Sequence, residues 1–306
     1  MYVEINVMYL FSYGVQKMMP LSIIILTKNE EANLSACLDS LKPLSAKIFV
    51  VDSGSTDSTV KIAQQADCQV FEHPFENHAK QLNWALQNLP ITTLWIMRLD
   101  ADERLTPALA EELKQILPQT PNIVTGYQIK RRVFFMGRWI RHGGYYPTWL
   151  LRIWRTGLGT CEERCMDEHI VLSQGKIANL QHDIIDENKK GLTFWINKHN
   201  HYAEREVKDL LDINIEDDLL LSQGQLSQAS QRRWIKKNLY RRSPLFLRAF
   251  FYFLMRYTIG LGFLDGIEGL IFHFLQGFWY RFLVDAKIYE LQRKCHHEAE
   301  VALIEQ

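Results

Sequence analysis

Three carboxylates follow directly on an apolar run in the first half of the chain. The segment "WIMRLDADE" ends with Asp100, Asp102 and Glu103. Carboxylates this close repel one another and raise each other's pKa, unless a cation or a hydrogen-bond donor lies among them. Asp100 and Asp102 lie on the same side of an extended segment, so both can reach one ligand. Hard oxygen donors suit Mg²⁺ or Mn²⁺, which bind substrate phosphates. We therefore expect a divalent-cation site; the alternative is a solvated acidic turn before the next helix.

A second polar cluster, "VDSGSTDST", begins with Asp52 at the end of another apolar run. Asp52 can accept hydrogen bonds from a ribose or a nucleobase, and residues 53–56 can turn sharply. Asp57 or Ser58 can cap the helix that follows. A plain strand–turn–helix joint would explain the glycine and the serines, but not the aspartate at the strand tip. The chain has no G-x-x-x-x-G-K-[ST] loop and no G-x-G-x-x-G, which disfavours P-loop kinases and the common dehydrogenases.

Alternating strands and helices are expected to position these clusters. Short apolar runs predict strands at 21–27, 47–53, 68–74 and 93–100. Amphipathic repeats between and after them predict helices at 31–41, 58–66, 78–89 and 108–117. Such alternation is typical of an α/β fold with a mostly parallel central sheet and helices on both faces.

In a parallel sheet, ligands collect at the carboxyl ends of the strands. The first predicted strand ends at Thr27-Lys28-Asn29-Glu30, the second at residues 52–57, and the fourth at residues 100–102. The three polar clusters therefore converge on one edge of the sheet. From about residue 125 the pattern changes to further strands at 125–137, 149–155 and 168–172, and from residue 192 onward the chain is predicted to be helical.

The segments "IIILTKNEEANLSACLDSL", "IFVVDSGSTDST" and "LWIMRLDADE", in this order and spacing, resemble the family-2 glycosyltransferases of the GT-A nucleotide-diphospho-sugar transferase fold. "HAKQLNWAL" is similar to the segment between the second and third motifs of that family. The resemblance covers roughly residues 20–200. It implies an inverting transferase, a nucleotide-sugar donor that is usually a UDP-sugar, and a divalent cation, Mg²⁺ or Mn²⁺, at Asp102 and Asp100. The nucleotide-sugar-binding residues that it implies are Thr27, Asn29, Glu30, Asp52, Ser53, Gly54, Ser55, Lys80 and Asp100.

An inverting transfer needs a base that takes the proton from the acceptor hydroxyl. The sequence resembles the lipopolysaccharide-core glucosyltransferases of this family, which carry a His-Glu pair before a short strand and a glycine. "MDEHIVLSQG" stands in that place, so Glu168 is the candidate base and Asp167 the reserve. A surface acidic turn is the alternative. The nearby "RHGGYYPTWLLRIWR" resembles the acceptor-side wall of the family; its aromatic residues Tyr145, Tyr146 and Trp149 either stack on a sugar or pack a small sheet.

The C-terminal third is basic and aromatic. Residues 219–264 contain no acidic residue but eight basic ones. Arg241, Arg248 and Arg256 share one side of a helix if the segment is continuous. Neither apolar block, 250–255 nor 269–284, reaches the roughly 18 uninterrupted apolar residues of a spanning helix. The pattern favours helices that lie in the membrane interface, with arginines on anionic headgroups. A buried aromatic core and an inserted hairpin are the second and third alternatives.

The chain has 306 residues, with 35 basic and 35 acidic side chains. This balance argues against a general nucleic-acid binder. Five scattered cysteines predict a reducing compartment, and Glu4 with no basic n-region argues against a signal peptide. Met18 and Met19 are alternative starts. We expect an N-terminal extension (1–19), a GT-A catalytic domain (20–205) and a helical, membrane-associated C-terminal region (206–306).

The C-terminal third is also similar to that of the lipopolysaccharide-core glycosyltransferases, and this resemblance implies a glycosyltransferase at the cytoplasmic face of the plasma membrane. It would be a peripheral enzyme, and its acceptor a lipid-linked or lipopolysaccharide-core-like glycan. Two alternatives differ in class. A nucleotidyltransferase of similar fold would need a glycine-rich, basic first loop, which "LTKNEE" is not. A non-catalytic membrane scaffold would not need the aspartates.

Overall fold

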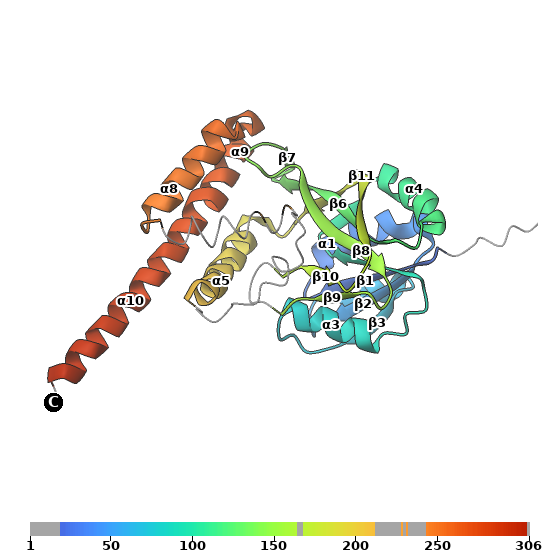
Figure 1. Cartoon of the computed structure of the whole chain (residues 1–306), viewed down its shortest axis with the longest axis horizontal. Coiled ribbons are helices and arrows are strands. Elements are labelled where there is room, and N and C mark those ends of the chain that lie inside the picture. The colour runs from blue at the N-terminus through green and yellow to red at the C-terminus, as the bar shows by residue number, and fades with distance from the viewer. Residues whose placement is uncertain (1–18, 164–167, 212–227, 229–230, 232–242, 305–306) are drawn as a thin grey trace, which may run out of the picture.

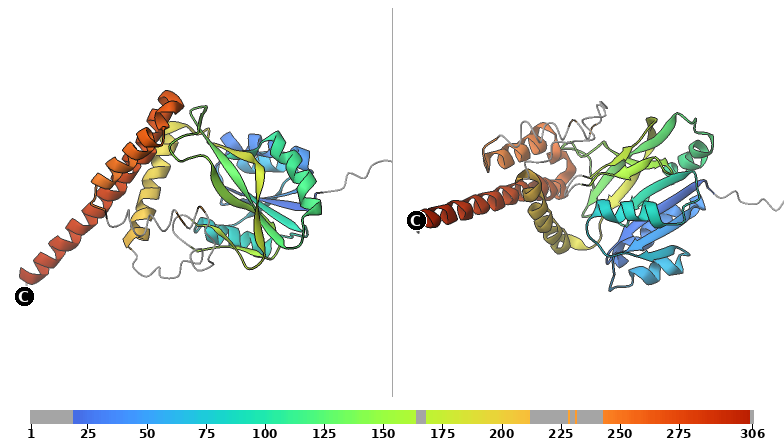
Figure 2. Two further views of the ribbon diagram at one scale, coloured as in Figure 1. Left: turned by 45° about the horizontal axis from the view of Figure 1, so that its top comes forward. Right: turned by 60° about the horizontal axis from the view of Figure 1, so that its bottom comes forward.

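A computed structural model of the chain describes residues 19–163, 168–211, 228, 231 and 243–304. A sheet with flanking helices forms one part of the molecule, and a group of C-terminal helices lies on one side of it (Figures 1 and 2). Residues 1–18 and the candidate reserve base Asp167 lie outside the described residues.

The main sheet has nine strands in the order β3-β2-β1-β4-β8-β6-β11-β5, with β7 paired to β6. The bounds of its strands are β1 Leu21–Thr27, β2 Lys47–Asp52, β3 Gln69–Glu72, β4 Trp95–Asp100, β5 Glu103–Leu105, β6 Val124–Phe135, β7 Arg138–Ile140, β8 Thr148–Arg155 and β11 Lys176–Glu187. A two-stranded ribbon pairs β9 (Gly159–Cys161) with β10 (Ile170–Leu172).

Strands β1 to β4 form a parallel half of the sheet, as the alternating pattern predicts. The other half is mixed: β8 is antiparallel to both β4 and β6, β11 is parallel to β6, and β5 is antiparallel to β11. "Mostly parallel" therefore describes only the first half of the sheet. The expected strands at 93–100 and 125–137 are confirmed with shifted ends, whereas the sequence analysis assigned no strand to β11.

Helices cover both faces of the parallel half. Their bounds are α1 Glu31–Leu41, α2 Thr59–Gln65, α3 His78–Asn88 and α4 Pro107–Ile116, with short 3₁₀ turns at Lys42–Leu44 and Leu117–Gln119. Alternate side chains of β1 serve the two faces, because successive residues of a strand point to opposite sides. Ile23 and Ile25 pack with α1, α2 and α4, while Ile24 packs with α3 and the β9–β10 ribbon.

The C-terminal helices form a separate layer. They are α5 (Gly191–Leu211), α8 (Leu247–Leu254), α9 (Gly266–His273) and α10 (Tyr280–Ile304), with π-helical turns η4 (Met255–Ile259) and η6 (Phe274–Trp279) and a 3₁₀ turn η5 (Gly262–Asp265). Ala203 and Val207 of α5 pack on Val284 and Ile288 of α10. Helix α5 runs without a break across residue 205, the expected boundary between the catalytic domain and the C-terminal region.

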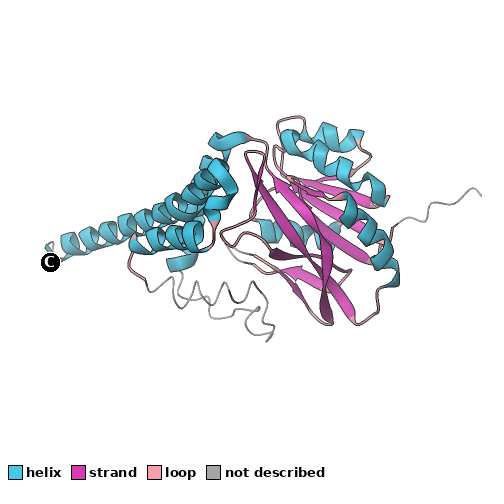
Figure 3. Cartoon of the chain, turned by 90° about the horizontal axis from the view of Figure 1, so that it is seen from above, coloured by secondary structure: helices cyan, strands magenta, loops and turns pink. Residues whose placement is uncertain are grey.

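No described helix is by itself long and apolar enough to cross a bilayer. The two segments Leu247–Ile259 and Gly262–Lys294 meet that criterion only as a pair, by length and composition alone, and the pair is bent by 71°. Figure 3 shows these helices side by side next to the sheet, with α10 extending beyond them.

Candidate active site

Asp52 organises the turn that follows β2. Its buried carboxylate accepts hydrogen bonds from the hydroxyl of Thr27 (2.9 Å) and from the backbone N–H groups of Gly54 (2.9 Å) and Ser55 (2.7 Å). Gly54 has φ +79°, a backbone conformation that favours glycine. The hydroxyl of Ser53 accepts a hydrogen bond from the side chain of Gln81 on α3 (3.0 Å). Thr27, Asp52, Ser53, Gly54 and Ser55 thus lie together at the carboxyl ends of β1 and β2.

The loop after β1 is joined to this turn. The backbone N–H of Asn29 donates to the hydroxyl of Ser55 (2.8 Å), and the Asn29 side-chain oxygen accepts from the N–H of Thr56 (2.8 Å). Lys28 donates to the carbonyl oxygen of Ser53 (2.9 Å). Hydrogen bonds therefore join the two loops, and Asn29 lies next to the turn that Asp52 organises.

The segment 188–190, between β11 and α5, connects Glu30 to Asp102. Lys190 forms an ion pair with Glu30 (2.6 Å), and the side-chain amide of Asn188 donates to Oδ2 of Asp102 (2.9 Å). The N–H of Lys189 donates to Asn33 (2.9 Å), which also donates to Glu30 (2.8 Å). The candidate residues of the first and fourth strands therefore surround one segment that the sequence analysis did not single out.

Arginine side chains balance the negative charge of the acidic residues that follow β4. Arg152 of β8 is buried and donates to Asp100 (2.8 Å) and to Glu103 (2.5 Å). Arg98 donates to the other oxygen of Asp100 (3.3 Å). Burial raises the pKa of Asp100, but the charges of Arg152 and Arg98 outweigh it and hold this pKa well below its usual range. Burial raises the pKa of Glu103 to about 7, against the opposing charge of Arg152.

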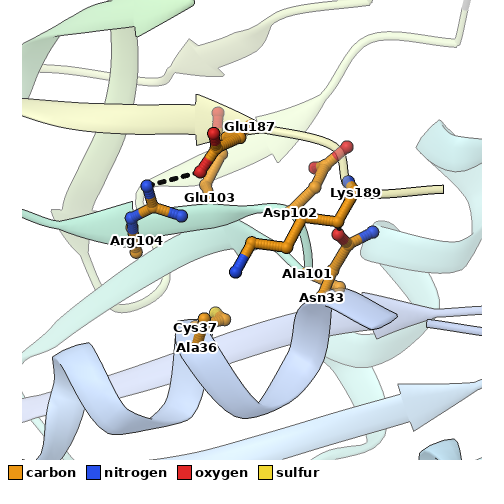
Figure 4. Close-up of a pocket in the computed structure, with 9 residues that line it drawn as sticks. All are labelled: Asn33, Ala36, Cys37, Ala101, Asp102, Glu103, Arg104, Glu187 and Lys189. Atoms are coloured by element: carbon orange, nitrogen blue, oxygen red, sulfur yellow. Dashed lines mark hydrogen bonds and ion pairs between the residues drawn. The ribbon is translucent and has the colours of Figure 1, made fainter. Parts of the chain in front are cut away.

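Asp102 is turned toward a different environment from Asp100. It lines a small pocket with Asn33, Cys37 and Lys189 (Figure 4). The expectation that both aspartates face a single cation is therefore revised, because arginines bind the carboxylate of Asp100. Within the described ranges, no group of three or more His, Cys, Asp or Glu side chains is placed to hold a metal.

Asp102 alone still fits a divalent cation that is shared with a substrate. Of its two carboxylate oxygens, only Oδ2 accepts a hydrogen bond from the described residues. Mg²⁺ keeps several waters and commonly takes only one or two carboxylates together with substrate phosphate. A donor set of one carboxylate is compatible with that chemistry, whereas a closed protein-only metal site is not present in the described part of the chain.

Two cations and a third aspartate, none of them predicted from the sequence, lie near Asp102. Burial raises the pKa of Asp186 to about 6, although Arg131 contacts it at 3.2 Å and opposes the shift. Burial lowers the pKa of Lys198 on α5, but Tyr202, Asp102 and Asp186 outweigh burial, and the net shift is upward. Lys198 thus brings positive charge from the C-terminal layer to the acidic edge of the sheet.

Glu168 lies half-buried just before β10 and acts on the same region. The pKa of His78, at the start of α3, is lowered by burial and by Arg98, while Glu168 and Asp100 partly offset that shift. Arg98, Glu168 and Asp100 are therefore each within electrostatic reach of His78. The position of Glu168 is compatible with its predicted role as a base.

Lys80 is not brought into the network described above. It lies exposed on α3 and pairs with Glu76 (2.5 Å). The aromatic residues of the predicted acceptor wall pack within the protein. Tyr145 stacks under Arg256 (3.9 Å to the ring centre) and against Phe272, and the hydroxyl of Tyr146 donates to Asp183.

The comparisons with known proteins agree with one another on the family. The family model described as "Glycosyl transferase family 2" matches residues 22–169. The lipopolysaccharide core biosynthesis glycosyltransferase LpsC of Rhizobium meliloti is 33% identical over 171 residues, which cover 53% of this chain and 60% of LpsC. The uncharacterized glycosyltransferase RT0209 of Rickettsia typhi is 28% identical, over 90% of this chain and 89% of its own.

A solved structure is also similar: glucosyl-3-phosphoglycerate synthase from Mycobacterium tuberculosis, in complex with Mn²⁺, uridine diphosphate and glucosyl-3-phosphoglycerate. It is 22% identical, covers 37% of this chain and 44% of its own, and has a TM-score of 0.31. A TM-score this low carries no argument about what the present chain binds. The family model and the two relatives, taken with the ordered motifs at the sheet edge, support a family-2 glycosyltransferase.

Proposed function

We propose that this protein transfers a sugar, with inversion, from a UDP-sugar to a lipid-linked or lipopolysaccharide-core-like glycan at the cytoplasmic face of the membrane. The observation that carries the proposal is the convergence of Glu30 and Asp102 on the segment 188–190, next to the turn organised by Asp52. The match to the family model favours sugar transfer over the nucleotidyltransferase and scaffold alternatives.

In the proposed reaction, Glu168 takes the proton of the acceptor hydroxyl while that oxygen forms a bond to the anomeric carbon. The bond from this carbon to the diphosphate oxygen breaks, and the nucleoside diphosphate leaves. Asp102 would hold a divalent cation, and that cation would supply positive charge for the diphosphate. Lys198 adds a fixed positive charge on the same side. The loops after β1 and β2 bind and orient the nucleotide.

The test is release of nucleoside diphosphate by the purified protein, with Mn²⁺ and a panel of nucleotide sugars. We expect turnover or slow hydrolysis with one nucleotide class and none after chelation. Asp102→Asn should lower the rate at least about 100-fold, because it weakens the metal ligand. Glu168→Gln should lower transfer on the order of 100-fold, with Glu163→Gln in the same loop as its matched control. No response to any donor would contradict the proposal.

A further inference from the structure

The segments Leu247–Ile259 and Gly262–Lys294 form a helical hairpin, which we call the C-terminal hairpin. Its first arm, Leu247–Ile259, has an exposed apolar stripe. Its side chains recur every three or four residues, so they share one side of the helix. They are between 41% and 80% exposed: Leu247, Phe250, Phe251, Leu254, Met255 and Ile259. The spacing is that of a buried face, yet no described part of the chain covers it. Soluble monomers rarely leave so much contiguous apolar surface open to water.

The second arm continues this surface. Phe263, Leu264, Ile267 and Phe274 are between 46% and 63% exposed. Aromatic contacts hold the two arms together, since Phe274 lies against Phe253 (6.1 Å between ring centres) and Phe263 against Tyr257 (6.4 Å). We call the exposed apolar side chains of α8, η4, η5, α9 and the start of η6 the apolar face.

The arginines of the hairpin do not extend from this face. Arg248 is buried and forms an ion pair with the buried Asp285. The Arg256 guanidinium donates to the carbonyl oxygen of Gly143 (2.6 Å), and Arg281 pairs with Glu206 (2.6 Å). The expectation that Arg248 and Arg256 contact headgroups therefore does not fit the structure, and Arg241 lies outside the described residues. The described basic residues that lie near the apolar face belong to another element.

The β6–β7 hairpin supplies them. Its turn presents Met136, which is 54% exposed, and Arg138 and Arg141 on and just after β7 are exposed as well. This hairpin packs against η5 and α9 through a shared core of Phe135, Ile140 and Phe272 (Figure 1). Two basic residues and one more apolar side chain therefore border the apolar face.

Contacts of His142 and Gly143 with the C-terminal hairpin, which we call the clasp, connect the catalytic part of the chain to the apolar face. The backbone N–H and Nδ1 of His142 contact the carboxylate of Asp265 (2.9 and 2.6 Å). The N–H of Gly143 donates to the carbonyl oxygen of Gly260 (2.7 Å). A Cβ atom on Gly143 would lie only 2.2 Å from the buried ring of His273, so the two segments approach as closely as glycine allows.

We propose that the apolar face, edged by Met136, Arg138 and Arg141, docks in the interfacial region of one leaflet of an anionic bilayer. The inference deepens the proposed function, since it rests on the membrane location assumed there. Charge selects the bilayer as occupant. Of the three acidic residues between 243 and 285, Asp285 is buried in an ion pair with Arg248, Asp265 is buried against His142, and only Glu268 is half-exposed. In the sequence just before the hairpin, residues 232–242 contain six basic residues and no acidic one.

No single described helix is long and apolar enough to cross a bilayer, which favours helices that lie in the interface over helices that cross it. Apolar side chains would enter the acyl boundary, and the β7 arginines would contact phosphate groups. The clasp would then hold the loop 142–145 at the lipid surface, where a lipid-linked acceptor presents its glycan.

Flotation of the full-length protein with vesicles tests the proposal. We expect binding to phosphatidylcholine vesicles with 30% phosphatidylglycerol (about three in ten lipids, a typical anionic share). Phe251→Asp with Ile259→Asp should weaken binding at least about tenfold. Arg138→Glu with Arg141→Glu should abolish the preference for anionic over neutral vesicles. Leu94→Asp and Ile123→Asp are the controls. They change apolar side chains of the sheet domain that are also exposed (52% and 58%), and these variants should bind as the parent does.

Two results would overturn the docking surface. One is that the parent does not bind vesicles, or that the variant with Phe251→Asp and Ile259→Asp binds them as strongly as the parent does. The other is a lipid-free dimer that these variants dissociate, which would mean that a second copy of the chain covers the face. Nucleoside diphosphate release without vesicles separates this failure from failure of the enzyme proposal, because Phe251 and Ile259 are not residues of the candidate active site.

Discussion

Arg152 determines how the acidic cluster after β4 behaves. It is buried, and its guanidinium is shared between Asp100 and Glu103. Removing one partner of a buried ion pair costs about 3–5 kcal/mol, because an uncompensated charge remains. We expect Arg152→Met to lower the free energy of unfolding by about 3 kcal/mol or more at pH 8, measured by urea denaturation. Arg138→Met, at an exposed position, should change it by less than about 0.5 kcal/mol. Equal effects would contradict this account.

Glu103 makes stability depend on pH near neutrality. Its pKa is about 7 in the folded protein, above the ordinary value of 4.5. The folded state therefore binds the proton more tightly than the unfolded state, and stability falls as pH rises from about 4.5 to 7. Glu103→Gln should flatten this fall, by up to about 3 kcal/mol. Urea denaturation at pH 5 and pH 7.5 measures it. A slope that is unchanged in the variant would exclude Glu103 as the source.

The same residues show where prediction from sequence ends. Asp52, Glu30 and Asp102 could be found because each follows an apolar strand in a recognisable motif. Arg152 and Asn188 could not, since they lie 52 and 86 residues along the chain from the aspartates they contact. An arginine on a strand carries no local signal of its partner. The expectation that one metal ion binds both aspartates left out arginine side chains as the other source of positive charge.

At the scale of elements, the clasp links the β7–β8 connection to the C-terminal hairpin. Asp265→Asn would remove the charge that His142 and the nearby His273 face. We expect local opening of the hairpin to become easier by about 1–3 kcal/mol. Hydrogen exchange of residues 247–273 should then speed up, while exchange in α1 stays unchanged. Glu268→Gln changes a half-exposed acid in the same hairpin and serves as the control.

The elements of the parallel half were predictable because their apolar runs are short, continuous and bounded by turns. Strand β11 was not, because "KIANLQHDIIDE" is largely polar and mixes buried with exposed positions without regular alternation. A register shift between Asn179 and Asp183 breaks its pairing with β6. Its last residues pair with β5 and lead directly into the segment 188–190, so missing β11 also meant missing a wall of the site.

At the scale of the molecule, α5 belongs to both parts. Its Lys198 faces the acidic edge of the sheet, and its Ala203 and Val207 pack on α10. Val284→Ala would leave a cavity at a fully buried position between these helices and should cost about 1–3 kcal/mol. We expect faster hydrogen exchange in α5 and slower donor turnover, although Val284 touches no substrate-binding residue. Leu291→Ala, at an exposed position of α10, is the control.

The arginine-balanced aspartate has a practical consequence for how the protein can be handled. Arg98 and Arg152 already supply counter-charge to Asp100 and Glu103, so these acids do not require an inorganic ion for the chain to fold. Purification in chelating buffer should yield folded but inactive enzyme, which regains turnover when a divalent metal salt is added back. Swapping magnesium, manganese or cobalt into one preparation then becomes a simple titration, rather than a refolding experiment.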